Sequence, residues 1–297
     1  MKHIIWSQWE ELKVPSGYTR LSPTNFNLET EDLSKITFYV PAYMSGRKGL
    51  EYSRAMSNLQ ILQMPNAGYD DALEFLRPGI TLCNARGVHD ASTAELAVGL
   101  GIAVRRGFYD FIRAQDNGEW LHRRYASLND SKIAIVGFGS IGQTLARYLS
   151  VYDVEITGYS RKGENGSKII GDLDKDISTY DIIFLTLPLN DESKNLFNAE
   201  RLAKMKDGSL LVNVARGAII NTDALLAELT SKRIFAGLDV TDPEPLPADH
   251  PLWRAPNCII APHVGGDSTA FESRGRGLVE AQLALLAAGE TLKNVVN

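Results

Sequence analysis

The stretch KIAIVGFGSIGQTLARYL, residues 132–149, decides the fold of this chain. It joins a run of aliphatic residues to a helical pattern through Gly137, Gly139 and Gly142, in the spacing G-x-G-x-x-G. A strand that leads through such glycines into a helix is typical of a dinucleotide-binding turn, because the helix N-terminus offers free N–H groups and partial positive charge. An ordinary glycine turn between a strand and a helix is the alternative interpretation, and the strand-to-helix context favours the first.

The glycines of this motif have separate expected roles. Gly137 permits the tight turn, Gly139 lets the backbone approach a pyrophosphate, and Gly142 allows the helix to pack closely on the strand. The residues of the turn that we expect to bind the cofactor are Gly137, Phe138, Gly139, Ser140, Ile141 and Gly142.

On both sides of this stretch, short apolar runs alternate with longer amphipathic ones. This alternation predicts an α/β fold with parallel sheets that are covered by helices on both faces. The predicted strands are residues 36–43, 59–65, 80–87, 132–136, 154–160, 181–187, 209–214, 234–240 and 257–261.

Two long helices are predicted as well. The first covers residues 92–116, where an apolar residue recurs at every fourth position and forms one stripe. The second covers residues 270–288 and ends at Gly289. The apolar stripe of the first helix is made of Leu96, Leu100, Val104 and Phe108.

Composition narrows the class of protein. The 297 residues include 31 Lys and Arg against 36 Asp and Glu, a net charge of −5, and this mildly acidic balance does not predict a nucleic-acid partner. Cys83 and Cys258 cannot form a disulfide framework, and no His, Cys or Asp cluster has metal-ligand spacing. Neither a signal peptide nor a membrane span is predicted, so we expect a cytoplasmic protein with no membrane partner.

The end of the next predicted strand, residues 154–160, indicates whether the cofactor is NAD or NADP. An NAD site usually places an acidic residue there to bind the ribose 2′-hydroxyl, whereas this chain has Ser160 and Arg161. A hydroxyl and a guanidinium suit a 2′-phosphate, which a carboxylate would repel. The sequence therefore favours NADP (NADPH), while NAD stays open because a solvated polar turn is the alternative.

Polar residues follow three later strands of the series. Arg216 lies in NVARGAIINTDAL, Asp239 and Glu244 lie in LDVTDPEP, and His263 lies in APHVGG. Because ligands bind beyond the carboxyl ends of strands in an open α/β sheet, these side chains are expected to converge on the cofactor crevice. Surface or loop roles are the alternatives for Arg216 and Glu244, and Asp242 competes with Glu244 for the acidic role.

At this point the chain resembles the D-isomer-specific 2-hydroxyacid dehydrogenases, of the glyoxylate/hydroxypyruvate reductase kind. The resemblance extends from about Leu59 to the C-terminal NVVN, and the first 35 residues match less clearly. Its motifs, in chain order, are NAGYD (66–70), NARGVHDASTAELAVGL (84–100), the glycine motif, LTLPLNDESKNLF (185–197), NVARGAIINTDAL, LDVTDPEP and APHVGG.

The resemblance implies an architecture and a set of roles. A Rossmann-type cofactor domain, residues 97–268, is inserted into a flavodoxin-like substrate domain, residues 1–96 and 269–297, so that two doubly wound parallel-sheet domains form. The catalytic residues are Arg216, Glu244 and His263, and the family is usually homodimeric through the long-helix region. The further binding residues implied are Leu187, Pro188, Ala215 and Asp239 for the cofactor, and Ala67, Gly68 and Arg216 for the substrate.

The residue types suit reduction of a small 2-oxoacid to the D-2-hydroxyacid. Histidine donates a proton near neutral pH, a carboxylate on its other ring nitrogen stabilises the imidazolium, and arginine clamps the substrate carboxylate. NAD-dependent oxidation of a D-2-hydroxyacid is one alternative, and a dinucleotide-sensing protein like the corepressors with this fold is another. A sensor needs no catalytic trio, and this chain keeps Arg216, Glu244 and His263. His89, after the loop at 84–87, is a candidate for lining the entrance of the site.

Overall fold

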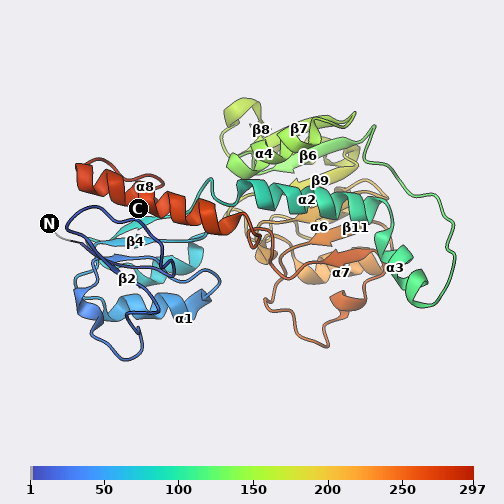
Figure 1. Cartoon of the computed structure of the whole chain (residues 1–297). Coiled ribbons are helices and arrows are strands. Elements are labelled where there is room, and N and C mark those ends of the chain that lie inside the picture. Colours follow the sequence, from blue (N-terminus) through green and yellow to red (C-terminus); the bar gives the residue numbers. More distant parts are fainter. Residues whose placement is uncertain (1–2) are drawn as a thin grey trace. The chain divides into compact units, whose positions relative to one another are not determined.

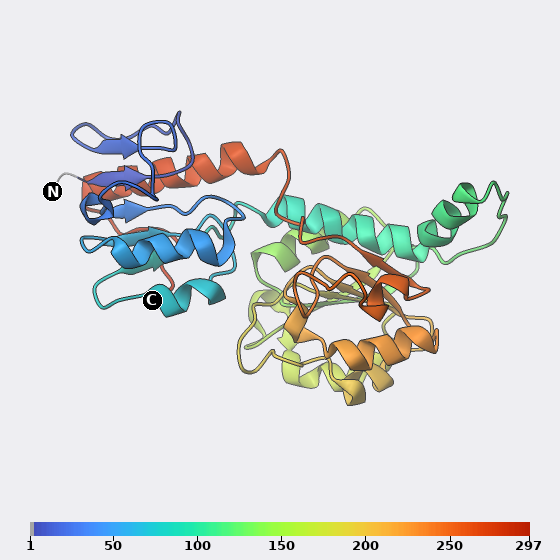
Figure 2. The same cartoon turned by 90° about the horizontal axis from the view of Figure 1, so that it is seen from below.

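The computed structural model describes residues 3–297 (Figures 1 and 2). The chain folds into two compact units, one of residues up to His89 together with Thr269–Asn297, the other of Asp90–Ser268. The first change of unit precedes the expected boundary at residue 96, because helix α2 (Asp90–Arg105) starts there and packs within the second unit. We describe each unit by itself.

The first unit is built on a parallel five-stranded sheet with the order β2-β1-β3-β4-β5. This is the flavodoxin-like order, so the predicted fold class is confirmed here. Two strands of the sheet, β1 and β2, were not predicted from the sequence. The strands are β1 (Ile4–Trp6), β2 (Thr19–Leu21), β3 (Phe38–Tyr39), β4 (Ile61–Gln63) and β5 (Thr81–Cys83).

Alternate side chains along these strands pack into two different apolar clusters, one on each face of the sheet. Ile5 and Phe38 pack with residues of helix α8 (Phe271–Ala288), whereas Trp6 and Tyr39 pack with Leu50 of helix α1 (Gly46–Glu51). The period of two along a strand therefore places α8 and α1 on opposite faces of the sheet, as Figure 1 shows. Short 3₁₀ helices cover Leu33–Lys35, Tyr52–Ala55 and Asp70–Phe75.

The second unit contains a parallel seven-stranded sheet with the order β12-β11-β10-β9-β6-β7-β8. Counted from β6, this is the Rossmann order, and the strand order reverses between β6 and β9. Ligands of such folds bind at that switch point, beyond the carboxyl ends of the strands. The strands are β6 (Lys132–Val136), β7 (Glu155–Ser160), β8 (Lys168–Ile169), β9 (Ile182–Leu185), β10 (Leu210–Asn213), β11 (Phe235–Leu238) and β12 (Cys258–Ile260).

Both faces of this second sheet are covered by helices. Ile133 and Phe184 pack toward α2 and α4 (Ser140–Leu149), and Ala134 and Leu185 pack toward the helices of the other face. Those helices are α5 (Leu173–Asp176), α6 (Ala199–Lys204) and α7 (Thr222–Thr230). The unit also has 3₁₀ helices at Glu164–Gly166, Ile170–Asp172, Ile177–Thr179, Gly217–Ile219 and Pro251–Arg254.

The prediction of one helix over residues 92–116 is wrong. Helix α2 ends at Arg105, and a separate helix α3 covers Phe108–Asp116. Gly107 between them has φ +70°, and a Cβ there would overlap the ring of Tyr125, so only glycine fits. The break turns Phe108 out of the apolar stripe, and it is 46% exposed.

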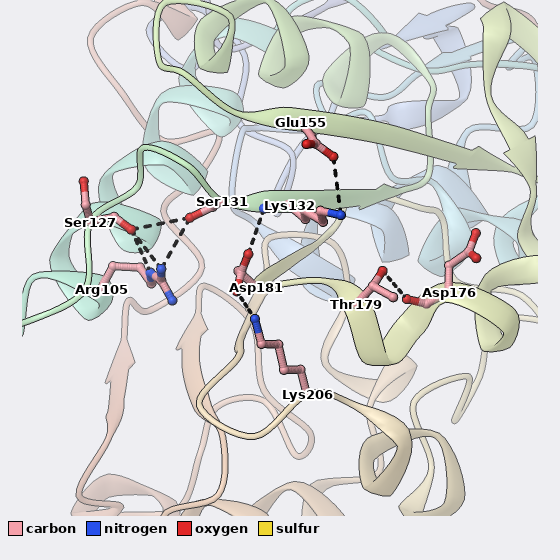
Figure 3. Close-up of polar contacts among 9 residues, drawn as sticks. All are labelled: Arg105, Ser127, Ser131, Lys132, Glu155, Asp176, Thr179, Asp181 and Lys206. Carbon is pink, nitrogen blue, oxygen red and sulfur yellow. Dashed lines mark hydrogen bonds and ion pairs between the residues drawn. The ribbon is translucent and has the colours of Figure 1, made fainter.

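Charged side chains fix the amino ends of the second sheet (Figure 3). Asp181, directly before β9, accepts hydrogen bonds from the Lys132 N–H at 2.9 Å and from Lys206 Nζ at 2.7 Å. Arg105, at the end of α2, donates to the Ser127 carbonyl at 2.9 Å and to Ser131 Oγ at 3.3 Å. The predicted cofactor-binding and catalytic residues of this unit lie at the opposite ends of the strands, the carboxyl ends. Among residues 3–297, no helix has the length and apolar character that a bilayer crossing needs.

Candidate active site

The glycine turn after β6 leaves open space in front of helix α4. Gly137 has φ +103°, and a Cβ there would overlap the backbone of Leu187, which follows β9. A Cβ on Gly142 would overlap the Gly137 carbonyl, whereas a Cβ on Gly139 would meet no atom within 4 Å. Since Gly139 directly precedes the first turn of α4, this open space beside free N–H groups fits a pyrophosphate.

Neighbouring side chains hold the turn in this shape. The ring of Phe138 lies against Gly158 of β7, where any Cβ would overlap it, and Thr186 Oγ1 donates to the Gly137 carbonyl at 2.7 Å. Leu187 is buried and Pro188 is exposed just beyond β9. The predicted cofactor residues of the turn and of the β9 end therefore lie side by side at the switch point of the sheet.

The segment after β7 forms a compact polar turn. Ser160 Oγ accepts hydrogen bonds from the Glu164 N–H at 2.9 Å and from Ser167 Oγ at 2.8 Å. Arg161 and Lys162 are exposed next to it. The acidic side chain nearest in sequence, that of Glu164, is exposed as well.

His263 and Glu244 form a short polar contact between side chains. His263 Nδ1 lies 2.5 Å from Glu244 Oε1, and the two side chains are 35% and 40% exposed. The hydrogen bond to Glu244 raises the pKa of His263 above its ordinary value, although burial acts against this. Burial acts to raise the pKa of Glu244, but the bond from His263 and its charge, with smaller contributions from the Thr241 backbone and Arg216, outweigh burial and lower that pKa.

Arg216 lies in the turn that follows β10. The buried Asn213 braces this turn, because its Nδ2 donates to the Arg216 carbonyl at 2.9 Å and its Oδ1 accepts from the N–H of Ala215 at 3.0 Å. Gly217 touches the next loop so closely that a Cβ would overlap the Thr241 carbonyl. Neither Asn213 nor Gly217 was predicted from the sequence, although both lie within the motif NVARG that pointed to Arg216.

Asp239 shapes the loop that carries His263. Its buried carboxylate accepts hydrogen bonds from the N–H groups of Val264 at 2.7 Å and Gly265 at 2.9 Å, and its carbonyl accepts from the His263 N–H. Burial raises the pKa of Asp239 in spite of these bonds. His263 itself has φ +55°, a left-handed conformation that this network stabilises. Contact of Asp239 with a nicotinamide amide stays a prediction.

The predicted substrate loop belongs to the first unit, where Ala67 and Gly68 are half-buried after β4. The expectation that His89 lines an entrance is wrong, because the residue is only 5% exposed and its Nε2 lies 2.8 Å from the Pro65 carbonyl. In the part of the chain that the structure describes, no three His, Cys, Asp or Glu side chains are grouped so that they could hold a metal ion.

Comparison of the sequence with known proteins gives a consistent set of relatives. Residues 98–265 match the family model described as "D-isomer specific 2-hydroxyacid dehydrogenase, NAD binding domain". A glyoxylate reductase of Thermofilum pendens is 33% identical over 262 residues, which cover 83% of this chain and 77% of the relative. The human glyoxylate reductase/hydroxypyruvate reductase is 33% identical over 228 residues, 71% of this chain and 69% of the relative.

Solved structures match the whole chain. A D-isomer specific 2-hydroxyacid dehydrogenase family protein of Aeromonas salmonicida has a TM-score of 0.84 at 25% identity, with 100% of this chain and 99% of that chain covered. An NADPH-dependent glyoxylate/hydroxypyruvate reductase of Sinorhizobium meliloti, solved with NADP and sulfate, has the same TM-score at 23% identity, with 100% and 98% covered. The second similarity establishes the fold alone.

Proposed function

Because this chain belongs to the D-isomer specific 2-hydroxyacid dehydrogenase family, we propose that it reduces a small 2-oxoacid, of the glyoxylate or hydroxypyruvate type, with NADPH. The product is the 2-hydroxyacid, which has the D configuration when the substrate is hydroxypyruvate and is the achiral glycolate when the substrate is glyoxylate. The curated relatives named glyoxylate reductase and glyoxylate reductase/hydroxypyruvate reductase support this substrate class. The pairing of His263 with Glu244 at 2.5 Å is the observation that carries the proposal, because a sensor of dinucleotides has no use for a charged proton donor.

Each residue of the site has a separate role in the proposed reaction. The glycine turn would hold the pyrophosphate of NADPH, and the bound cofactor would supply the hydride that the carbonyl carbon takes up. His263 uses Nδ1 for Glu244, which leaves Nε2 to donate a proton to the carbonyl oxygen. Arg216 binds the substrate carboxylate through its planar guanidinium and polarises the carbonyl group. The backbone N–H groups near Ala67 and Gly68 bind the same carboxylate.

The proposed preference for NADPH rests on the turn after β7. Ser160 and Arg161 occupy the position at which an NAD site usually has an acid, and the Arg161 guanidinium is exposed to a ligand.

Steady-state kinetics tests the proposal directly. Oxidation of NADPH and of NADH is followed with glyoxylate, hydroxypyruvate, pyruvate and longer 2-oxoacids. The chirality of the product is determined for every substrate except glyoxylate, whose product, glycolate, has no stereocentre. We expect turnover of at least one small 2-oxoacid to the D-2-hydroxyacid. Tight cofactor binding without turnover of any member of the panel would support a sensor instead.

Replacing Glu244 with Gln should shift the pH dependence of reduction. Glutamine keeps a hydrogen bond to the imidazole but removes the negative charge, so the pKa of His263 falls toward or below its ordinary value. Reduction needs protonated His263 and is lost as pH rises through that pKa, so the alkaline limb of kcat/KM moves to lower pH. A pH–rate profile identical to that of the wild type would remove Glu244 from this role and turn attention to Asp242.

We also propose that the protein is a homodimer that works in the cytoplasm. Large apolar side chains lie exposed on α3 and the segment after it, among them Ile112 at 59% and Trp120 at 97%. Such a group favours association with a second copy, and the buried free thiols of Cys83 and Cys258 suit a reducing compartment. Sedimentation at micromolar concentration should give twice the mass of 32.7 kDa, and Trp120→Ser should lower that mass, whereas a monomeric wild type would contradict the proposal.

A further inference from the structure

Three successive carbonyl groups at the start of the substrate loop are bound by one segment, residues 84–89. The Pro65 carbonyl accepts from His89 Nε2, the Asn66 carbonyl from the Ala85 N–H, and the Ala67 carbonyl from Asn84 Nδ2. Each of these distances is 2.8 Å. These carbonyl oxygens therefore tie the start of the loop to residues 84–89.

Peptide geometry then fixes where the N–H groups of the loop point. In a planar trans peptide, the N–H of the next residue points opposite to the carbonyl, and the peptide bonds after Pro65, Asn66 and Ala67 are all trans. The N–H groups of Asn66, Ala67 and Gly68 consequently point away from residues 84–89. Within residues 3–297 none of these three groups donates to a protein acceptor, although the carbonyls beside them are all bound. Successive free N–H groups on one side of a turn attract an anion.

Asn84 is held rigidly in the position from which it donates to Ala67. The residue is 8% exposed, its Oδ1 accepts from the Arg86 N–H at 3.2 Å, and its carbonyl accepts from Gln63 Nε2 at 3.1 Å. Gln63 is fully buried and its Oε1 accepts from Gln282 Nε2 of helix α8 at 2.9 Å. The buried amides of Gln63 and Gln282 therefore fix the backbone of Asn84, and the bond from the Arg86 N–H orients its side chain toward the loop.

His89 is fixed by stacking. Its ring centroid lies 5.4 Å from that of Tyr43 and 5.3 Å from that of Phe271, with interplanar angles of 17° and 9°. Because a carbonyl oxygen can only accept, the short contact with Pro65 requires a proton on Nε2. The aromatic stack thus orients an N–H donor at the first of the three carbonyls.

We propose that Asn84 and His89 are positioning residues that turn the N–H groups of Asn66, Ala67 and Gly68 toward the carboxylate of the substrate. The inference rests on the proposed function, since it gives these N–H groups the carboxylate of a 2-oxoacid. Neither side chain touches the substrate; each acts through the carbonyl that it binds. Their loss therefore weakens binding of the carboxylate and leaves the cofactor site in the other unit unchanged.

Asn84→Asp tests this role most sharply, because the side chain keeps its shape and its bond from Arg86 but places an acceptor against the Ala67 carbonyl. KM for glyoxylate should rise about ten- to a hundredfold, the range for a lost buried hydrogen bond, while KM for NADPH stays within about twofold. Asn58→Asp is the matched control, since Asn58 is exposed in the same unit and donates to the Ser34 carbonyl. The control should leave both constants unchanged.

A second variant and a second readout keep the test decisive if Asn84→Asp does not fold. His89→Phe keeps the stack and removes the donor, and His89→Gln should restore part of the effect because it offers an N–H. Hydrogen exchange at the Ala85 amide, which donates to the Asn66 carbonyl of the loop, should quicken in Asn84→Asp or His89→Phe, and not in the control. A folded variant with unchanged KM for glyoxylate, or with an equal rise in KM for NADPH, would overturn the inference. If the wild type reduces no 2-oxoacid, the proposed function fails, and the exchange rates alone decide whether these residues set the loop.

Discussion

His263→Asn should lower kcat for reduction of a 2-oxoacid by about two to four orders of magnitude, the range for loss of a general acid. The proton for the developing alkoxide comes from His263, and the amide of asparagine cannot supply it. Asparagine is the substitution of choice because His263 has φ +55°, a left-handed conformation that asparagine adopts more readily than most residues. The loop held by Asp239 should therefore persist, and the affinity for the cofactor should change little.

The matched control for this variant is His250→Asn. His250 Nδ1 accepts from the Leu252 N–H at the start of a 3₁₀ helix, and asparagine is equally good at that capping position. Single-turnover rates and cofactor affinity by fluorescence would separate the chemical step from binding. Near-wild-type turnover in His263→Asn would show that the proton comes from another group.

Strong local patterns made most of the fold predictable from the sequence. Strands such as 132–136 and 181–187 are continuous apolar runs because helices cover both faces of the sheet, and each reappears within a few residues in the structure. Strand β2 escaped prediction because it contains the polar residues Thr19 and Arg20 at the edge of its sheet, and β1 escaped because the polar residues Ser7 and Gln8 cut its apolar run short. The break at Gly107 was missed because the apolar stripe continues past it to Phe108, although a glycine after two arginines is a common helix end.

In the candidate site too, some residues could be predicted from the sequence and others could not. Arg216, Glu244 and His263 were predicted because each lies in a distinctive short motif at the end of a strand. The bracing contacts could not be predicted, because the bond of Asn213 to the Arg216 turn and that of Asn84 to the Ala67 carbonyl depend on three-dimensional placement. His89 was misjudged because its ring is covered by Phe271, which lies far along the chain.

NADPH should exceed NADH in kcat/KM by at least about tenfold, and the double variant Ser160→Asp with Arg161→Ala should reverse that preference. A guanidinium that binds a 2′-phosphate forms charge-assisted hydrogen bonds worth about 1.5–3 kcal/mol each, or about ten- to a hundredfold in affinity. The new carboxylate would accept from a ribose 2′-hydroxyl and repel a 2′-phosphate. An aspartate at position 160 can also keep the acceptor for the Glu164 N–H, so the turn after β7 should retain its shape.

Both cofactors should be measured at one low salt concentration and again at higher salt, because screening reduces the advantage of an exposed guanidinium for the 2′-phosphate. Arg147→Ala serves as the control, since Arg147 is an exposed arginine of helix α4 outside the turn that we assign to the ribose. We expect the wild-type preference to shrink with salt, the control to match the wild type, and the double variant to favour NADH at both concentrations. Equal kcat/KM values for the two cofactors in the wild type, or a preference for NADH, would rule out the assignment of Arg161. The exposed carboxylate of Glu164 would then be the group to replace, because it is the nearest acid to the ribose position in the sequence.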